Sequence, residues 1–347
     1  MNIFKVHSLR SRRIGVAFAA AILLAHAARA EPAGFIPINP TDQIRTMGRG
    51  LNILGYDPRW RDFQKARFQE RHFRTIKEGG FQTVRVVLRA FSHMDADNRI
   101  EPGWLRTLDW AAETALSNGL TVILDEHDFN PCGSDAQTCK PKLLAFWEQV
   151  AEHYKDSPNT VLFEVLNEPH NQVTPALWNQ WVKEALGIIR KTNPRRNVVI
   201  GPASWNDISY LDRLQLPEDD RNLIVTVHYY RPMNFTHQGA SWNKRTADLS
   251  GISWGTDEEK RQVESDFAGV QAWSVAHKRP ILLGEFGAYD GGGADLDSRV
   301  RYTSHVARKA ESLGWPWIYW QFDYNFIVYD MTRDDWVRPI WRALIPE

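Results

Sequence analysis

Two glutamates stand at the ends of short apolar segments of the chain. Glu168 follows Val-Leu-Phe-Glu-Val-Leu-Asn, and Glu285 follows Pro-Ile-Leu-Leu-Gly. Runs of this length and apolar character are typical of strands that are buried on both faces. The carboxyl ends of parallel barrel strands meet at one mouth, where such barrels carry out their chemistry. Two acids that converge there are the minimum equipment for cleaving a glycosidic bond, so this spacing predicts that reaction.

Retaining hydrolysis of a glycoside requires two carboxyl groups with different pKa values. Glu168 follows the neutral Asn167, which can bond a sugar hydroxyl without stabilising an ionised Glu168, so we expect Glu168 to be the acid and then the base. Glu285 is the expected nucleophile, with Arg85 as the candidate cation and Tyr230 as the candidate donor that keep it ionised. A structural ion pair is the alternative for a single glutamate. Two glutamates in matching positions of the repeat unit favour catalysis.

Apolar strand-like runs alternate with amphipathic segments from residue 50 to the end of the chain. The predicted strands are Gly50–Leu54, Thr83–Leu88, Thr121–Asp125, Val161–Val165, Asn197–Gly201, Leu223–His228, Ile281–Gly284 and Trp317–Trp320. The predicted helices include Phe63–Glu78, Pro102–Asn118, Lys142–Lys155, Thr174–Lys191, Asp257–His277 and Asp297–Leu313. This alternation predicts an α/β fold, a single-domain (β/α)8 TIM barrel. An open doubly wound sheet is the competing fold, but residues 50–55 do not form its glycine-rich turn.

Motifs in the order of the predicted strands carry a family resemblance. They are Arg49-Gly50-x-Asn52, Arg85, His127 in Leu-Asp-Glu-His-Asp, Asn167-Glu168-Pro169, His228 and Tyr230 in Val-His-Tyr-Tyr, Glu285 in Gly-Glu-Phe-Gly, and Trp320 in Tyr-Trp-Gln-Phe-Asp. With them the chain resembles glycoside hydrolase family 5, the cellulase-like retaining β-glycanases of clan A, which form (β/α)8 barrels. The resemblance covers nearly all of the chain after residue 30.

The resemblance implies a role for each matched residue. Glu168 would be the general acid/base and Glu285 the nucleophile, and the supporting side chains would bind or position the substrate and the nucleophile. These are Asn167 on the 2-hydroxyl of the cleaved sugar, Arg85 and Tyr230 beside Glu285, His127 and His228 along the same subsite, Trp320 as a stacking platform, and Asn52 in the first-strand motif. The reaction would need no cofactor.

Each supporting residue also has a purely structural alternative. His127 and His228 could pair with Asp125 or Asp128, and they could ligate a metal, although no H-E-x-x-H spacing supports a metal site. Trp320 could cap the barrel core. Trp205, in Gly-Pro-Ala-Ser-Trp-Asn after the fifth predicted strand, is a candidate for a further sugar subsite or for packing.

Cys132 and Cys139 lie close together in the polar segment Asn-Pro-Cys-Gly-Ser-Asp-Ala-Gln-Thr-Cys. In an exported protein this spacing predicts a disulfide that holds a loop at the rim of the cleft. Two free thiols are the alternative. A metal site is disfavoured because no histidine pair lies nearby.

The N-terminal segment has the features of a cleaved secretory signal. Basic residues precede an apolar run over residues 14–25, which is too short to span a bilayer, and Ala28-Arg29-Ala30 fits a cleavage site. We expect residues 1–30 to be removed after Ala30 and residues 31–347 to form a secreted or periplasmic catalytic domain. An uncleaved membrane anchor is the alternative. Arg12-Arg13 leaves both Sec and twin-arginine export open.

The charge balance indicates the class of partner. The chain holds 42 basic and 42 acidic residues, but the predicted signal carries five of the basic ones and no acidic one. The remainder therefore has 37 basic and 42 acidic residues, a formal charge of −5, without a basic patch. We expect no nucleic-acid partner, no membrane contact after cleavage, a neutral glycan substrate and a monomeric protein.

The expected activity is that of an endo-β-1,4-glucanase on soluble β-glucan, acting by double displacement. A β-1,3-glucanase, a β-mannanase and a transglycosylase are alternatives on the same scaffold. A non-catalytic glycan-binding barrel is an alternative of another class, and the presence of both Glu168 and Glu285 argues against it. The chain has no G-x-S-x-G elbow, which disfavours an α/β-hydrolase.

Overall fold

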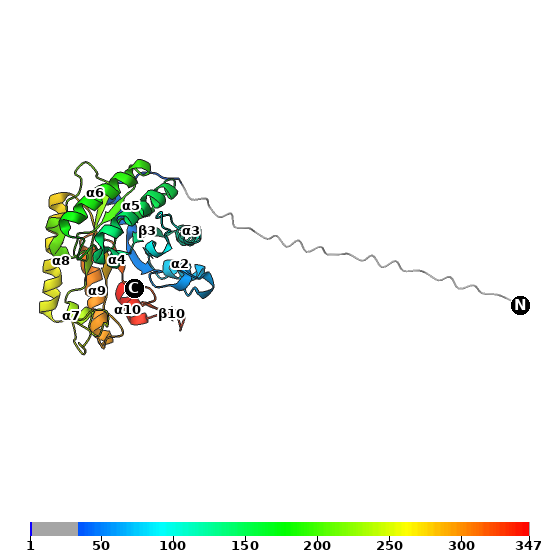
Figure 1. The fold of residues 1–347 in the computed structure, drawn as a ribbon. Helices are drawn as coiled ribbons and strands as arrows, with labels where there is room; N and C mark the ends of the chain where they lie inside the picture. Colours follow the sequence, from blue (N-terminus) through cyan, green and yellow to red (C-terminus); the bar gives the residue numbers. More distant parts are fainter. Residues whose placement is uncertain (2–33, 347) are drawn as a thin grey trace. The chain divides into compact units, whose positions relative to one another are not determined.

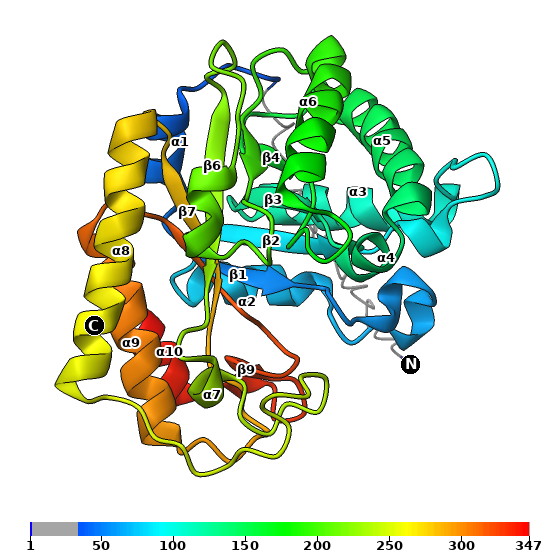
Figure 2. The same ribbon diagram turned by 60° about the vertical axis from the view of Figure 1, so that its left-hand side comes forward.

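A closed barrel of parallel strands forms the centre of the molecule (Figures 1 and 2). The computed structural model describes residue 1 and residues 34–346, so nearly all of the predicted signal lies outside the described residues. The strands follow one another around the barrel in chain order. They are β1 (Arg49–Ile53), β2 (Thr83–Leu88), β3 (Thr121–Glu126), β4 (Val161–Glu164), β5 (Val198–Ile200), β6 (Leu223–Tyr229), β7 (Ile281–Phe286) and β8 (Trp317–Tyr319).

Helices connect the strands and cover the outside of the barrel, as the (β/α)8 prediction requires. The α-helices are α1 (Pro40–Met47), α2 (Glu70–Glu78), α3 (Pro102–Ser117), α4 (Phe129–Ser134), α5 (Ala136–His153), α6 (Pro175–Thr192), α7 (Met233–Thr236), α8 (Asp257–His277), α9 (Leu296–Ser312) and α10 (Arg338–Leu344). Short 3-10 turns are η1 (Pro58–Trp60), η2 (Phe63–Lys65), η3 (Phe91–His93) and η4 (Ile208–Arg213), and β9 (Tyr329–Asp330) pairs with β10 (Asp335–Trp336). Figure 2 shows α5 beside α6, and α8 beside α9. Within the described residues, no helix has the length and apolar character needed to cross a membrane.

The predicted barrel is confirmed, with local differences at the ends of its elements. The segment 63–78 is not one helix, because Asp62 caps the short turn η2 and the chain leaves helical geometry before α2. The cysteine segment is not a polar loop. Asp135 accepts from the backbone N–H groups of Gln137 and Thr138 and so starts α5 directly after α4.

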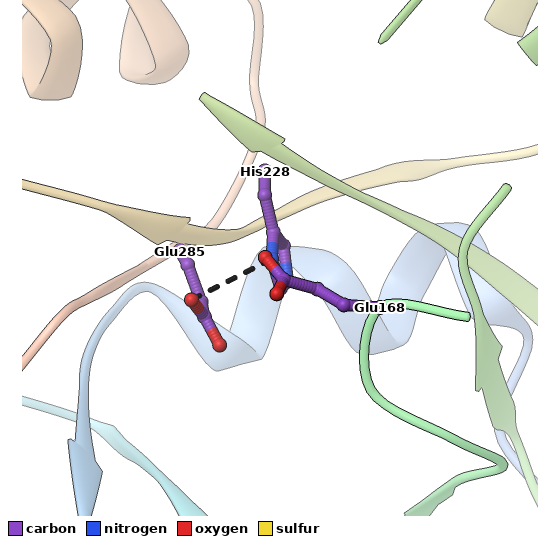
Figure 3. A group of neighbouring side chains, drawn as sticks. All are labelled: Glu168, His228 and Glu285. Carbon is purple, nitrogen blue, oxygen red and sulfur yellow. Dashed lines mark hydrogen bonds and ion pairs between the residues drawn. The ribbon is translucent and has the colours of Figure 1, made fainter. Parts of the chain in front are cut away.

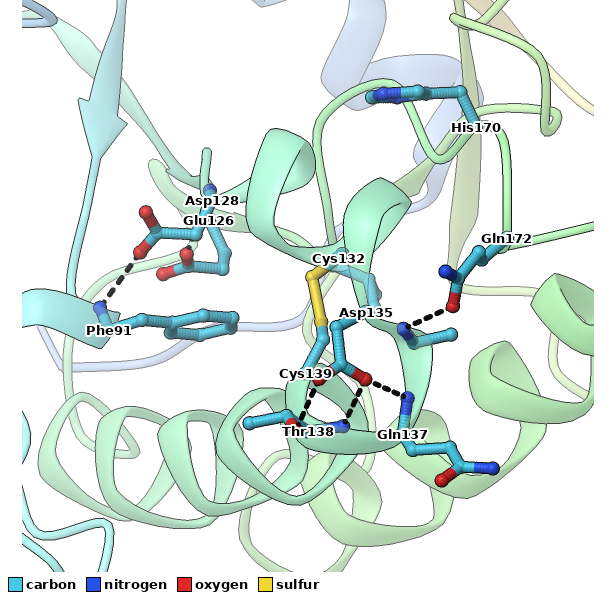
Figure 4. Close-up of a disulfide and its surroundings, with 12 residues drawn as sticks. Phe91, Glu126, Asp128, Cys132, Asp135, Gln137, Thr138, Cys139, His170 and Gln172 are labelled. Atoms are coloured by element: carbon cyan, nitrogen blue, oxygen red, sulfur yellow. Dashed lines mark hydrogen bonds between the residues drawn. A yellow bond between two sulfur atoms is a disulfide. The ribbon is translucent and has the colours of Figure 1, made fainter.

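The two cysteines join these consecutive helices. Cys132 of α4 and Cys139 of α5 form the disulfide, and both are buried (Figure 4). The bridge therefore fixes α4 against α5 instead of pinning a loop. Asn130, in the first turn of α4, lines the cleft at the barrel mouth, so this linkage bears on the shape of the rim.

The inside of the barrel changes from apolar to charged along the strands. At the amino ends of the strands, Ile123, Leu162 and Ile318 pack with Ile44 and Met47 of α1, which closes this end. Successive inward side chains lie two residues apart on a strand. The next inward residue after Ile123 on β3 is therefore Asp125, and the next one after Leu162 on β4 is Glu164. An apolar floor thus lies beneath a layer of buried charges at the mouth.

Candidate active site

Glu168, His228 and Glu285 converge at the mouth of the barrel, and Figure 3 shows the two carboxyl groups facing each other beside the imidazole. One oxygen of each glutamate and one nitrogen of His228 lie within 4.8 Å of one another. The Glu168 side chain is 15% exposed and that of Glu285 is 5% exposed. Carboxyl groups about 5–5.5 Å apart belong to retaining glycosidases, whereas inverting enzymes place them about 6.5–9.5 Å apart.

Three different elements position these side chains. Glu285 is the fifth residue of β7, and Glu168 lies just beyond β4 in a left-handed backbone conformation, with a φ of 43°. His228 lies near the end of β6, where the register with β7 shifts between Val227 and His228. Its Nδ1 is 2.8 Å from Oε1 of Glu168 and 3.5 Å from Oε2 of Glu285.

The surroundings of the two carboxyl groups differ. Glu285 receives a hydrogen bond of 2.9 Å from Nη1 of Arg85 and one of 3.0 Å from the hydroxyl of Tyr230. Glu168 has the ring of His228 as its side-chain partner, and no lysine or arginine of residues 34–346 forms an ion pair with it. Donors and a cation at Glu285 favour its ionised form, while Glu168 has less support for a charge.

Arg85 lies at the centre of the buried charges. Its guanidinium binds Glu164 through two hydrogen bonds of 2.7 and 2.8 Å and lies 3.0 Å from Asp125, in addition to its contact with Glu285. The sequence reasoning missed Glu164 and, as a partner of Arg85, Asp125. The signal was present, because a charged residue inside an otherwise apolar strand needs a partner of opposite charge nearby.

Asn52 and Arg85 lie below the cleft and have no exposed surface. The Asn52 amide donates to the carbonyl oxygens of Gly284 and Tyr319, both at 3.2 Å, and accepts from Arg85 at 2.8 Å. Their contacts suit the place beside Glu285 that the sequence predicts for Arg85. Asn52 reaches Glu285 only through Arg85 and the carbonyl oxygen of Gly284.

His127, Asn167 and Trp320 line the cleft together. The His127 ring lies parallel to that of Trp320, with centroids 5.5 Å apart and an angle of 7°, and its Nδ1 is 2.5 Å from Asp125. His127 thus pairs with Asp125 and also lines the cleft, so the structural alternative and the predicted place along the subsite do not exclude each other. Asn167 accepts from Arg85 at 2.8 Å, and its Nδ2 is 3.4 Å from Nε2 of His127.

The cleft has a volume of about 870 Å³ and carries exposed aromatic side chains. Trp205, 48% exposed, stacks on His170 with ring centroids 4.7 Å apart. Trp242, in the segment after β6, and Tyr324, in the segment after β8, also line the cleft and are also exposed. Trp205 therefore lines the cleft instead of the core, which is the position that the subsite prediction requires.

Comparison with known proteins identifies the family to which this barrel belongs. The profile of the cellulase family, glycosyl hydrolase family 5, matches residues 45–326, a range that includes every residue of the cluster described above. This chain belongs to glycosyl hydrolase family 5. The (β/α)8 barrel described above is consistent with this membership.

Relatives of this family 5 chain agree with the assignment. It is 30% identical over 292 residues to Endoglucanase H of Acetivibrio thermocellus. The matched region covers 82% of this chain but only 30% of the length of that relative. The structure of Thermotoga maritima Cel5A in complex with cellobiose superposes with a TM-score of 0.84 at 38% identity, covering 88% of this chain and all of the other. The complex of the same enzyme with mannotriose gives 0.84 at 37% identity, with the same coverage.

The protonation of this family 5 site follows from burial. Burial raises the pKa of Glu168 to about 8, which the charge of Arg85 opposes only in part. Burial also raises the pKa of Glu285, while His228, Arg85 and the hydroxyl of Tyr230 act in the opposite direction. Burial lowers the pKa of His228 to about 4, so its ring is neutral near pH 7.

These directions predict a bell-shaped dependence of kcat/KM on pH. With Glu168 as the general acid that the sequence predicts, activity is expected to fall as pH rises through about 8, because Glu168 then loses its proton. With Glu285 as the predicted nucleophile, activity is expected to fall at low pH as Glu285 gains a proton, with a midpoint above the ordinary glutamate range. Initial rates on phenyl β-cellobioside from pH 4 to 10 measure both limbs. A 2,4-dinitrophenyl leaving group departs without protonation, so the alkaline limb is expected to disappear with that substrate. If the limb persisted, a group other than Glu168 would cause it.

The cluster of Glu168, His228 and Glu285 is also the group among the described residues whose atoms are close enough to hold a metal ion. A cation there would occupy the lone pairs of both carboxyl groups. We expect EDTA to leave turnover unchanged and Zn²⁺ to inhibit competitively with substrate. Loss of activity on chelation and recovery on adding a metal would contradict this prediction.

Proposed function

We propose that this family 5 chain is a retaining β-glycoside hydrolase with endo-β-1,4-glucanase activity on soluble β-glucan. The observation that supports it most is the approach of one oxygen of Glu168 to one of Glu285 within 4.8 Å. That distance leaves room for one anomeric carbon but not for an additional water on the opposite face of the sugar. The different surroundings of the two carboxyl groups supply the two roles.

The proposed reaction has two displacements. Glu168 donates its proton to the glycosidic oxygen while a carboxylate oxygen of Glu285 bonds to the anomeric carbon, and the shortened chain leaves as an alcohol. Glu168, now ionised, takes a proton from water, the resulting hydroxide adds to the anomeric carbon, and the bond to Glu285 breaks. Both carboxyl groups return to their starting states, and no cofactor takes part.

Neighbouring side chains support these two steps. Arg85 and Tyr230 hold Glu285 by hydrogen bonds of 2.9 and 3.0 Å, which limits its rotation and favours its ionised state. Asn167 lines the cleft and has its Nδ2 3.4 Å from Nε2 of His127, so its amide suits the 2-hydroxyl of the cleaved sugar. The ring of Trp320 offers an apolar face to the sugar.

The extent of the cleft supports endo action. Its walls include Tyr56 after β1, Tyr324 after β8 and Trp205 after β5. Because β1 and β5 lie across a closed barrel of eight strands from one another, the cleft passes over the whole mouth. A long glycan can therefore extend to both sides of the two glutamates.

A β-mannanase is the second candidate. Thermotoga maritima Cel5A has been crystallised with both mannotriose and cellobiose, and it is 37% identical to this chain in the first complex. Activity on β-1,3-glucan and glycosyl transfer to a sugar acceptor use the same two glutamates. A non-catalytic glycan-binding barrel is disfavoured, because it would have no use for a protonated Glu168 beside an ionised Glu285.

A panel of defined polysaccharides tests the proposal. We expect the purified protein to release oligosaccharides of mixed length from soluble β-1,4-glucan faster than from β-1,3-glucan or mannan. Proton NMR during the first turnovers is expected to show the β-anomer as the initial product. An α-anomer would indicate inversion, and the absence of any reducing ends across the panel would refute a hydrolase.

We also propose that the chain is exported, with cleavage after Ala30, and acts as a monomeric barrel of residues 31–347. The basic start, the apolar run and Ala28-Arg29-Ala30 support export. N-terminal sequencing of protein recovered outside the cytoplasm would give Glu31 as the first residue, and light scattering would give the mass of a monomer.

A further inference from the structure

An unusual backbone segment lies directly after β5. Ser204, Trp205 and Asn206 have φ values of 65°, 61° and 52°, so three successive residues that are not glycine adopt the left-handed conformation. Such residues are uncommon singly, and they persist where the surrounding structure holds them. Strained segments of this kind concentrate at functional sites. The contacts of this turn therefore show which function it serves.

The turn connects the two segments that carry Glu168 and His228. The N–H of Ser204 donates to the carbonyl oxygen of Pro169, the residue after Glu168, at 2.6 Å. The N–H of His228 donates to the carbonyl oxygen of Asn206 at 3.0 Å. The turn thus extends the pairing beyond β5 to the place where the register of β6 shifts.

The side chain of Asn206 lies under the imidazole of His228. It has no exposed surface, and its Nδ2 is 3.3 Å from Nε2 of His228. Its Oδ1 lies over Gly201, where an added Cβ would come within 2.2 Å of that oxygen. Only glycine at 201 leaves room for the amide, so the residue directly after β5 helps to place Asn206.

The amide determines which nitrogen of His228 carries the proton. A neutral imidazole has one N–H and one acceptor nitrogen. With the NH₂ group of Asn206 on Nε2, Nε2 would be the acceptor and the proton would lie on Nδ1. In this orientation of the amide, Oδ1 of Asn206 is buried and has no hydrogen-bond partner among the described residues. Nδ1 is the atom that lies 2.8 Å from Glu168 and 3.5 Å from Glu285.

We propose that Asn206 is a positioning residue for the hydrolysis described above: it fixes the Nδ1–H tautomer of His228, which donates to Oε1 of Glu168. The proposal rests on the proposed function for its kinetic consequence. Oε2 of Glu168 is then left to hold the proton and deliver it to the leaving group. In the opposite tautomer, the lone pair on Nδ1 would accept that proton and compete with the glycosidic oxygen.

The charged and titratable groups around His228 are consistent with a fixed neutral tautomer. Glu168 and Glu285 face Nδ1, while Arg85 and Glu164 act on the ring from the layer beneath. No carboxylate of the described residues is a hydrogen-bond partner of Nε2, which has the Asn206 amide instead. Asparagine at 206 therefore supplies a donor without adding a charge.

Kinetics of two variants and two substrates test the proposal. Asn206→Ala removes the donor, and the isosteric Asn206→Asp places an acceptor on Nε2. For both we expect kcat/KM on phenyl β-cellobioside, which needs the acid, to fall by about tenfold or more, which is part of the roughly 10²–10⁴-fold that general acid catalysis contributes. On 2,4-dinitrophenyl β-cellobioside, which does not need it, we expect less than about a threefold change, because that step bypasses the acid.

The pH profile gives a second readout. A carboxylate at position 206 favours the imidazolium form of His228, and a cation beside Glu168 lowers the pKa of Glu168. We therefore expect the alkaline limb of Asn206→Asp to move to lower pH. Asn197→Asp is the matched control, because Asn197 is a buried asparagine just before the opposite end of β5, and we expect it to leave both readouts unchanged.

¹⁵N NMR of histidine-labelled wild-type protein measures the tautomer directly and does not depend on activity or on the folding of a variant. The expected result is a protonated Nδ1 and an unprotonated Nε2 at His228. The opposite tautomer would overturn the proposal, as would equal losses on both aryl glycosides with an unmoved alkaline limb. If the wild-type protein cleaves no glycoside, the proposed function fails, while the NMR result still decides the tautomer.

Discussion

Replacing Glu285 by Gln is expected to abolish hydrolysis and to preserve glycan binding. Gln has nearly the same shape but cannot form the covalent bond to the anomeric carbon, and removal of such a nucleophile lowers kcat by a factor on the order of 10⁵. The fold should persist because Arg85 keeps Glu164 and Asp125 as partners. Turnover of phenyl β-cellobioside, and calorimetry with a cello-oligosaccharide, measure the two quantities separately.

The same exchange at the other end of the barrel is the control. Glu311 accepts hydrogen bonds from Arg49 and from the indole of Trp317, the first residues of β1 and β8, and it does not line the cleft, so Glu311→Gln is expected to keep turnover near the wild-type rate. If Glu285→Gln retained activity, another group would be the nucleophile. If the wild-type protein bound glycan with no turnover and the variant behaved identically, the chain would be a binding barrel.

Replacing Arg85 by Met is expected to be the most destabilising single change at the site. It would leave Asp125, Glu164 and Glu285 buried without their shared cation. Breaking a buried ion pair by removing one partner costs about 3–5 kcal/mol. Urea unfolding at pH 7 would show this loss as a lower midpoint, and activity would fall with it because Glu285 loses the hydrogen bond and the charge of Arg85.

The pH dependence of this loss distinguishes charge from packing. Burial already raises the pKa of Asp125 well above its ordinary value, and without Arg85 the carboxyl groups would bind protons more readily still. The native variant then holds more protons than its unfolded chain, so its stability is expected to decrease as pH rises from 5 to 8.

Arg196→Met is the matched control. Arg196 is also buried, but it donates to carbonyl oxygens such as those of Val161 and Tyr154, so its cost should be nearly independent of pH. A pH-independent cost for Arg85→Met would contradict the assignment.

The strands and the two glutamates were predictable because both depend on local patterns. Apolar runs and their spacing predicted the strands to within two residues at each end, and every predicted strand is present. Residues such as His228 and Tyr230 could be placed because they belong to short motifs at strand ends. Their contacts with Glu168 and Glu285 join strands that are far apart in sequence, and the order of the barrel brings those strands together.

The rest of the site depends on contacts that no short motif reveals. Asn206 acquires its position from the missing side chain of Gly201 and from a left-handed turn, and neither has a local pattern in Gly-Pro-Ala-Ser-Trp-Asn. The burial of Asn52 beside Arg85 depends on the register of β1 and β2, which pairs the two residues across neighbouring strands. The predicted helix Lys142–Lys155 covers only the later part of α5. The polar composition around Cys132 and Cys139 predicts a loop instead of α4 and the first turns of α5, whereas Asp135 serves as a helix cap.

The helix α1 closes the amino end of the barrel. Ile44 and Met47 rest against the apolar floor, and the side chain of Asn39 anchors the first turn by accepting from the N–H of Thr41. Proteolytic trimming is therefore tolerable only upstream of Asn39. A cut inside residues 40–47 would open the amino end of the barrel and admit water beneath the buried charges that hold Glu285.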